Sequence, residues 1–206
     1  MKIGAAIVAM AMAGCAGTPS ATSFASAAPR AADDWRRVAT PADRDRLRRW
    51  RDAWVAALPR ARAADPAGVA AEGALFDSDR TLPGAPPSGR YRCRVFKLGA
   101  KGTATGEFTA YPAFDCRIDD EGRVRSFYKL TGSQRPVGLL FPDGEREVFL
   151  GTLTLGDERT ALQYGQDGER DMVGMMERVG DRRWRLVLPW PRFESLLDVV
   201  ELVPAE

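Results

Sequence analysis

The stretch Arg90-Tyr-Arg-Cys-Arg-Val-Phe-Lys-Leu98 decides the fold, because apolar and charged side chains alternate along it. Tyr91, Cys93 and Val95 fall on one face of an extended chain, and this period of two is typical of a half-buried β-strand. The same period recurs through the rest of the chain. It predicts strands over residues 90–98, 107–118, 123–131, 136–141, 146–155, 160–164, 171–179, 183–188 and 196–203.

Turn-forming residues separate these segments, as in Asp120-Glu-Gly122, Pro142-Asp-Gly144 and Asp167-Gly168. Short strands joined by tight turns favour an antiparallel meander that closes into a barrel or a strongly curved sheet. A doubly wound parallel sheet is disfavoured, because no helical pattern separates the strands. The sequence therefore predicts a mainly β protein with N-terminal α structure, in which residues 89–206 form an antiparallel β-barrel-like (meander) domain.

Residues 34–88 are predicted to form a helical segment followed by a proline-rich loop. A helix is expected from Asp34 to Ala64, with Thr40 as an N-cap before a proline. Pro59 should kink or end this helix, because proline lacks a backbone donor. One apolar stripe runs along it, formed by Leu47, Trp50, Trp54 and Leu58. We expect this amphipathic helix to dock on the β domain through the stripe; a partner helix or a membrane surface is the alternative.

The first fifteen residues are typical of a bacterial lipoprotein signal peptide. Lys2 precedes an apolar run that is too short to span a bilayer, and the run ends in Met12-Ala-Gly-Cys15, which resembles a lipobox. Lipidation of Cys15 would anchor the protein to the membrane, and residues 16–33 are expected to be a flexible tether. Ala16 after the cysteine favours the outer membrane, on its periplasmic side. Cleavage after Ala27 is the alternative.

Composition excludes several classes of function. The 206 residues carry 30 Lys and Arg against 28 Asp and Glu, so the net charge of +2 argues against nucleic-acid binding. The chain has 0 His and 3 Cys, which removes histidine bases, histidine metal ligands and a four-thiolate zinc site. No metal and no cofactor are expected.

Cys93 and Cys116 are expected to form a disulfide. Each lies in an alternating segment, and export to an oxidising compartment makes the bond the default. Two free buried thiols are the alternative. A catalytic thiol is disfavoured because no histidine exists to activate it.

Five charged residues at strand ends are the candidate ligand-binding set. If they face inward and gather, they form a polar cluster at a ligand site, because buried charges need mutual satisfaction. The alternative is ordinary strand-end salt bridging. The set is Lys129, Arg135, Glu169, Arg170 and Asp171.

The sequence also offers two catalytic arrangements. Lys129 and Ser133 are close enough in sequence for a Ser–Lys pair, but their order matches no acylase signature. A carboxylate pair for glycoside hydrolysis could come from a set of acids in or near predicted turns. These are Glu158, Glu169, Asp171, Glu177 and Glu194.

Several strings resemble an uncharacterised bacterial family, catalogued as domain of unknown function 4893. The resemblance extends over roughly residues 35–205 and implies export, but it supplies no catalytic residues. The matching strings are Arg90–Gly99, Tyr111–Cys116, Lys129–Pro136, Val148–Thr152, Glu169–Gly174, Arg183–Pro191, Glu194-Ser195 and Asp198-Val199.

We therefore expect an uncharacterised lipid-anchored envelope protein that acts as a non-enzymatic binding module for a small or apolar ligand, or for an envelope partner. A carboxylate-dependent hydrolase of envelope glycans and a structural or assembly lipoprotein are the alternatives. The structure of the barrel interior distinguishes these three hypotheses. A hollow apolar barrel favours binding, facing carboxylates in an open cleft favour hydrolysis, and a filled barrel with an exposed apolar patch favours assembly.

Overall fold

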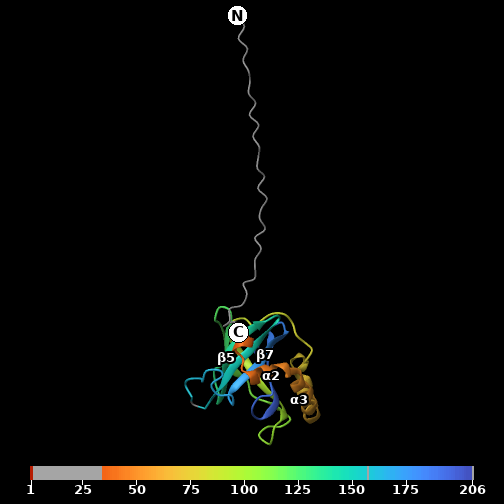
Figure 1. Ribbon diagram of the computed structural model, residues 1–206. Helices are drawn as coiled ribbons and strands as arrows, with labels where there is room; N and C mark the ends of the chain where they lie inside the picture. The colour runs from red at the N-terminus through yellow and green to blue at the C-terminus, as the bar shows by residue number, and fades with distance from the viewer. Residues whose placement is uncertain (2–33, 157, 206) are drawn as a thin grey trace.

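The computed structural model describes residue 1, residues 34–156 and residues 158–205 (Figure 1). The predicted lipobox with Cys15 and the predicted tether lie outside these residues. The helices are α1 (Trp35–Val38), α2 (Pro41–Arg48), α3 (Trp50–Ala64), α4 (Pro66–Ala71) and the 3-10 helix η2 (Gly73–Phe76). The strands are β1 (Gly89–Ala100), β2 (Phe108–Ala110), β3 (Phe114–Asp120), β4 (Arg125–Lys129), β5 (Gln134–Asp143), β6 (Arg146–Leu155), β7 (Asp171–Gly180), β8 (Arg183–Pro189) and β9 (Ser195–Pro204).

The strands form one closed antiparallel barrel, which confirms the predicted fold class. Each strand from β3 to β8 pairs with the strand that follows it, and β1 pairs with β3 on one edge. The ring closes where β1 pairs with β9, from Tyr91 opposite Pro204 to Ala100 opposite Ser195. Eight strands, β1 and β3 to β9, make the wall, while β2 extends the β3 edge of β1.

Two of the predicted strands differ from the structure: one is interrupted and one is absent from the described chain. The segment 107–118 is interrupted between β2 and β3, where Pro112 cannot donate a ladder hydrogen bond and the strand carries one extra residue against β1. Residues 160–164 form no strand. The Tyr164 hydroxyl instead accepts a hydrogen bond from Thr40 N (3.0 Å) and donates one to Asp43 (2.6 Å). These bonds hold the β6–β7 connection on α2, and β6 pairs directly with β7.

The single helix predicted over 34–64 is divided into α1, α2 and α3. Thr40 caps α2 as expected, with its side chain accepting from Asp43 N. Pro59 does not end α3, which continues to Ala64. Val55 and Pro59 both lie on the exposed face of α3, so the carbonyl that loses its intrahelical partner can be hydrated.

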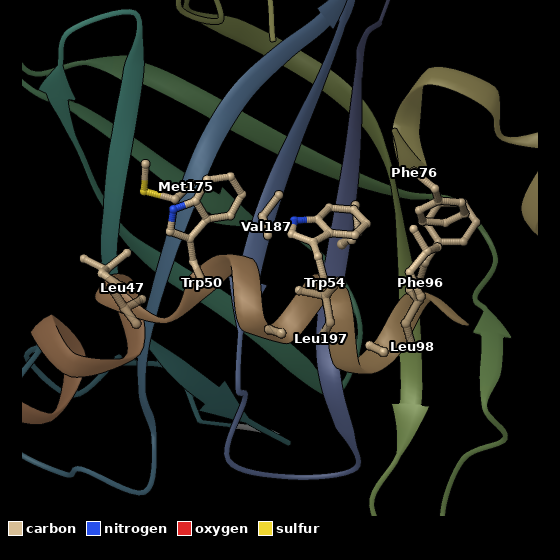
Figure 2. Packing of buried hydrophobic residues seen from close by; sticks show 14 of the residues in the cluster. Leu47, Trp50, Trp54, Phe76, Phe96, Leu98, Met175, Val187 and Leu197 are labelled. Atoms are coloured by element: carbon tan, nitrogen blue, oxygen red, sulfur yellow. The ribbon is translucent and has the colours of Figure 1, made fainter. Parts of the chain in front are cut away.

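The helices cover one side of the outer wall of the barrel, over β1 and β7 to β9. Trp50 and Trp54 point from α3 towards the strands, and Figure 2 shows them beside Met175 of β7 and Val187 of β8. Leu47 joins them in the same buried cluster, and Trp54 is only 3% exposed. The stripe therefore packs against the β domain in the described chain.

A buried ion pair binds the segment after α4 to the same wall. Arg185 is 0% exposed, and its Nε donates to Glu177 (2.8 Å) on the neighbouring strand. Its Nη1 donates to the backbone oxygens of Leu75 (2.9 Å) and Asp77 (2.7 Å). The guanidinium thus satisfies carbonyls of the turn around η2 and fixes that turn on the barrel.

The barrel interior is filled at one end, which we call the closed end. Its side chains come from all eight wall strands and include Tyr91, Ile118, Phe127, Leu140, Phe149, Met176, Trp184 and Leu202. The proline-rich loop covers this end, because Tyr91 donates to Pro87 O and Trp184 Nε1 donates to Gly84 O (3.0 Å).

The predicted disulfide joins Cys93 of β1 to Cys116 of β3, with 6.1 Å between the two Cα atoms. Both residues are 0% exposed and face the barrel interior. The bond lies next to the position where β1 leaves β3 and begins to pair with β2.

Candidate functional site: the open mouth of the barrel

The other end of the barrel is hollow, and we call it the mouth. A cavity of about 400 Å³ lies there, between the ends of β1, β4, β6 and β8 and the starts of β3, β5, β7 and β9. The residues of its wall face inward like those of the closed end, and they lie nearer the mouth along the same strands. The apolar members are Val95, Phe114, Pro136, Leu153, Met172, Leu188 and Val200. A cavity of this size and lining is in the range of small-molecule sites.

Glycines shape the wall between the filled and hollow halves. Gly138 of β5 and Gly151 of β6 face each other. A Cβ on Gly151 would lie 2.4 Å from the Phe149 ring and 2.4 Å from Val137 O. A Cβ on Gly138 would lie 2.8 Å from the same ring. The absence of side chains at these two positions therefore gives the Phe149 ring its space.

A buried polar cluster lies on the β1–β9 side of the mouth. Lys97 Nζ donates to Asp198 Oδ2 at 2.7 Å and lies 3.2 Å from a Glu194 carboxylate oxygen. The buried Ser195 hydroxyl donates to the other oxygen of Asp198. Burial raises the pKa of Asp198, although Lys97 and Ser195 oppose that rise. Burial also disfavours the ammonium, but Asp198 and Glu194 outweigh it and raise the pKa of Lys97, so Lys97 is a charged, paired lysine.

Lys129 is the second lysine of the mouth, and its surroundings differ. It is half-buried at the end of β4, on the inward face, with its ammonium 4.2 Å from the centre of the Phe114 ring. Burial lowers its pKa, and the charges of Lys97 and Arg135 lower it further. Within residues 34–156 and 158–205, Lys129 has no salt bridge.

The rim of the mouth carries exposed side chains from loops. Arg192, in the β8–β9 connection, forms a two-point ion pair with Glu169 from the β6–β7 connection. Phe193 and Tyr111 also line the cavity and are 53% and 38% exposed. Because these lining residues are exposed, this side of the cavity lies at the protein surface.

The five predicted ligand-site residues lie around this mouth but not in one network. Lys129, Glu169, Arg170 and Asp171 line the cavity, whereas Arg135 does not. Arg135 donates to Glu158 O (2.7 Å), and Arg170 donates to the Glu158 carboxylate (2.7 Å), so these two arginines share a neighbour.

Asp171 belongs to the contact with α2 rather than to a charge cluster. Its carboxylate accepts from Gly165 N (2.9 Å), and its carbonyl accepts from Arg46 (3.2 Å). Burial raises the pKa of Asp171, and the backbone bond from Gly165 partly offsets that rise. Of the five residues, Lys129 alone combines an inward position with a charge that no carboxylate balances in the described chain.

The structure also places the residues of the two catalytic arrangements. Ser133, in the β4–β5 turn, lines the cavity, as does Lys129 at the end of β4. The remaining candidate acids are each held by a cation: Glu158 by Arg170, Glu169 by Arg192, Glu177 by Arg185, and Glu194 by Lys97. Among the described residues no three His, Cys, Asp or Glu side chains are grouped so as to hold a metal ion.

Sequence reasoning missed Lys97 and Asp198. The signal was present, because Lys97 shares the strand face of Tyr91, Cys93 and Val95, and Asp198 shares the face of Val200. A charge on an otherwise apolar strand face requires a buried partner, and each of these residues is that partner for the other.

Fold and site together define a closed antiparallel β-barrel with one filled end, one open apolar mouth and a helical cover on its outer wall. A family model described as Domain of unknown function (DUF4893) matches residues 35–202, and the chain belongs to this family. No curated protein and no solved structure matches the chain. In the part of the chain that the structure describes, no helix has the length and hydropathy needed to cross a membrane.

Proposed function

We propose that this protein is a binding module that holds a small, largely apolar ligand in the mouth of its barrel. The observation that carries the proposal is the division of the interior. Aromatic and aliphatic side chains fill one half, and a cavity of about 400 Å³ with an apolar wall occupies the other. Eight-stranded barrels have an interior wide enough for packed side chains or one small ligand, and this barrel contains both situations.

The way the barrel is built supports a ligand site rather than a packing defect. The disulfide, the β1–β9 closure and the Lys97–Asp198 pair all fix the strands around the cavity. A wall held in this way is preorganised, so a ligand does not have to order it on binding.

We further propose that the barrel is anchored in the bacterial envelope through a lipid on Cys15, on the periplasmic side of the outer membrane. The Met12–Cys15 string and the short apolar run before it support this location. Metabolic labelling with a palmitate analogue tests the anchor. Label should enter the wild-type protein and be lost in Cys15→Ser, and label that persists in Cys15→Ser would overturn the anchor without affecting the binding proposal.

Native mass spectrometry of the protein purified from its own envelope tests the binding proposal. A bound small molecule should appear as an additional mass on the folded wild-type protein. Leu153→Trp places a large side chain inside the cavity and should remove that mass. Leu139→Trp adds the same side chain at an exposed position on the same sheet and should retain it. An additional mass that both variants keep would place the ligand elsewhere and overturn the proposal.

A further inference from the structure

The two lysines of the mouth differ in how far nearby carboxylates balance their charge. Lys97 lies between two carboxylates, Asp198 at 2.7 Å and Glu194 at 3.2 Å. Its charge is therefore already more than balanced inside the protein. An anionic ligand approaching Lys97 would meet these carboxylates and be repelled, so Lys97 is a structural cation of the barrel wall.

Lys129 has no such balance. Its ammonium lies over the Phe114 ring and packs against the β4–β5 turn, where a Cβ on Gly132 would lie 3.3 Å from Nζ. The charged neighbours that act on it are Lys97 and Arg135, which are both cations. The aromatic face offers a weak attraction compared with a carboxylate at hydrogen-bond distance.

The position of Lys129 matters as much as its charge. It occupies the inward position of β4 that follows the buried Phe127. It lines the same cavity as Val95, Leu153 and Met172. A ligand whose apolar body fills the cavity would therefore have its polar end within reach of the ammonium. Partial burial strengthens a charge-assisted hydrogen bond at that point, because water screens it less.

We propose that the ligand is an amphipathic anion: a single carboxylate, or a comparable anionic group, on a compact apolar body, with the anion bound by Lys129. This inference rests on the proposed function and specifies the ligand class for the same cavity. The anion supplies the carboxylate partner that Lys129 lacks among the described residues, and the apolar body covers the aliphatic and aromatic wall.

Calorimetric titration with three probes built on an unbranched ten-carbon skeleton separates head-group recognition from apolar binding. The probes are decanoate, decan-1-ol and decyltrimethylammonium, which share a chain and differ in charge. Decanoate should bind wild-type protein about 10- to 100-fold more tightly than decan-1-ol, the range given by one hydrogen bond to a charged group. The cationic probe should bind more weakly than decan-1-ol.

Variants assign the effect to one residue. Lys129→Met keeps most of the apolar stem and should reduce decanoate affinity to that of decan-1-ol, while decan-1-ol affinity stays unchanged. Lys129→Arg keeps the charge and should retain the preference for decanoate. Arg182→Met is the charge-matched control, because Arg182 is an exposed residue of the β7–β8 turn, beyond the closed end, and should not change either affinity.

The outcomes distinguish the two proposals. Equal affinities for decanoate and decan-1-ol, both lost in Leu153→Trp, would overturn the anion inference and keep the mouth as an apolar site. A decanoate preference that survives Lys129→Met would also overturn the inference. Failure of all three probes to bind, or binding that Leu153→Trp does not change, would overturn the proposed function together with the inference.

Discussion

Lys97 Nζ lies 2.7 Å from Asp198 Oδ2, and the two residues face each other across β1 and β9, the strands that close the barrel. The pair is buried and lies on the inward face, nearer the open end of the barrel than Val95 and Val200. The closure of the sheet and the electrostatics of the cavity therefore depend on the same two side chains. Lys129, on the same inner surface, has no equivalent partner in the described chain.

The two lysines should respond differently to removal of charge. Lys97→Met leaves the buried carboxylate of Asp198 and the partly buried one of Glu194 without their cation, so it should destabilise the fold by about 3–5 kcal/mol. Lys129→Met removes a desolvated cation whose charged neighbours are cations, so stability should change by no more than about 0.5 kcal/mol. Urea unfolding of both variants measures this. Equal destabilisation by the two substitutions would show that Lys129 is a structural cation as well.

Trp54→Ala should destabilise the protein by about 3–5 kcal/mol, because the indole is buried between α3 and the outer wall of the barrel. Val55→Ala is the matched control, because Val55 is 75% exposed on the other face of the same helix and its loss should have little effect. Thermal unfolding monitored by circular dichroism compares the two. An unchanged melting temperature in Trp54→Ala would mean that the stripe does not hold the helix on the barrel.

Replacing both disulfide cysteines with alanine should cost about 3 kcal/mol by the chain-entropy estimate for a closed loop of this length, with a further cost from the cavities left by the sulfur atoms. The two residues are separated by 23 positions in sequence and are fully buried. Alkylation of the unfolded, unreduced protein checks the bond independently. Modification of Cys93 and Cys116 without reductant would contradict it.

Tyr91 should contribute to loss of stability at alkaline pH. Burial raises the pKa of Tyr91 to about 12, above the ordinary value of 10.0, so folding favours the protonated phenol. Its stabilising contribution is complete below pH 10 and is lost as the pH rises from 10 to 12, which corresponds to about 2–3 kcal/mol.

The variant Tyr91→Phe isolates this contribution. It should cost about 1 kcal/mol at neutral pH through loss of the bond to Pro87, and its stability should fall less steeply than wild type above pH 10. Burial also raises the pKa of Tyr164, so part of the alkaline loss remains in the variant. Parallel curves for the two proteins between pH 10 and 12 would be inconsistent with a buried Tyr91 hydroxyl.

The β fold could be predicted because alternation along segments such as 90–98 records burial on one face directly. The same reasoning failed at 160–164, where the partly buried Tyr164 is held by hydrogen bonds to Thr40 and Asp43 at a helix distant in sequence, a contact with no local signature. It also failed at Pro59, since only the packed structure shows that this face of α3 is exposed to water.

The site was less accessible from sequence. Charge at strand ends points to Lys129 and its neighbours, but charge alone does not show which carboxylate each cation meets. Glu158, which binds Arg170 and lies beside Arg135, comes from a connection whose position depends on the closed barrel. Whether the interior is filled or hollow depends on how eight inner faces pack together, and no single strand contains that information.

The central claim is that a small amphipathic molecule occupies the mouth of the barrel. Amide chemical-shift mapping of the ¹⁵N-labelled protein during titration with decanoate tests it most directly. We predict that the shifts concentrate at inward-facing mouth positions, including Lys129, Leu153, Met172 and Val200, while Leu140 and Trp184 at the closed end do not move. Shifts confined to the outer wall and α3, or no shifts at any concentration at which decanoate stays monomeric, would contradict the account.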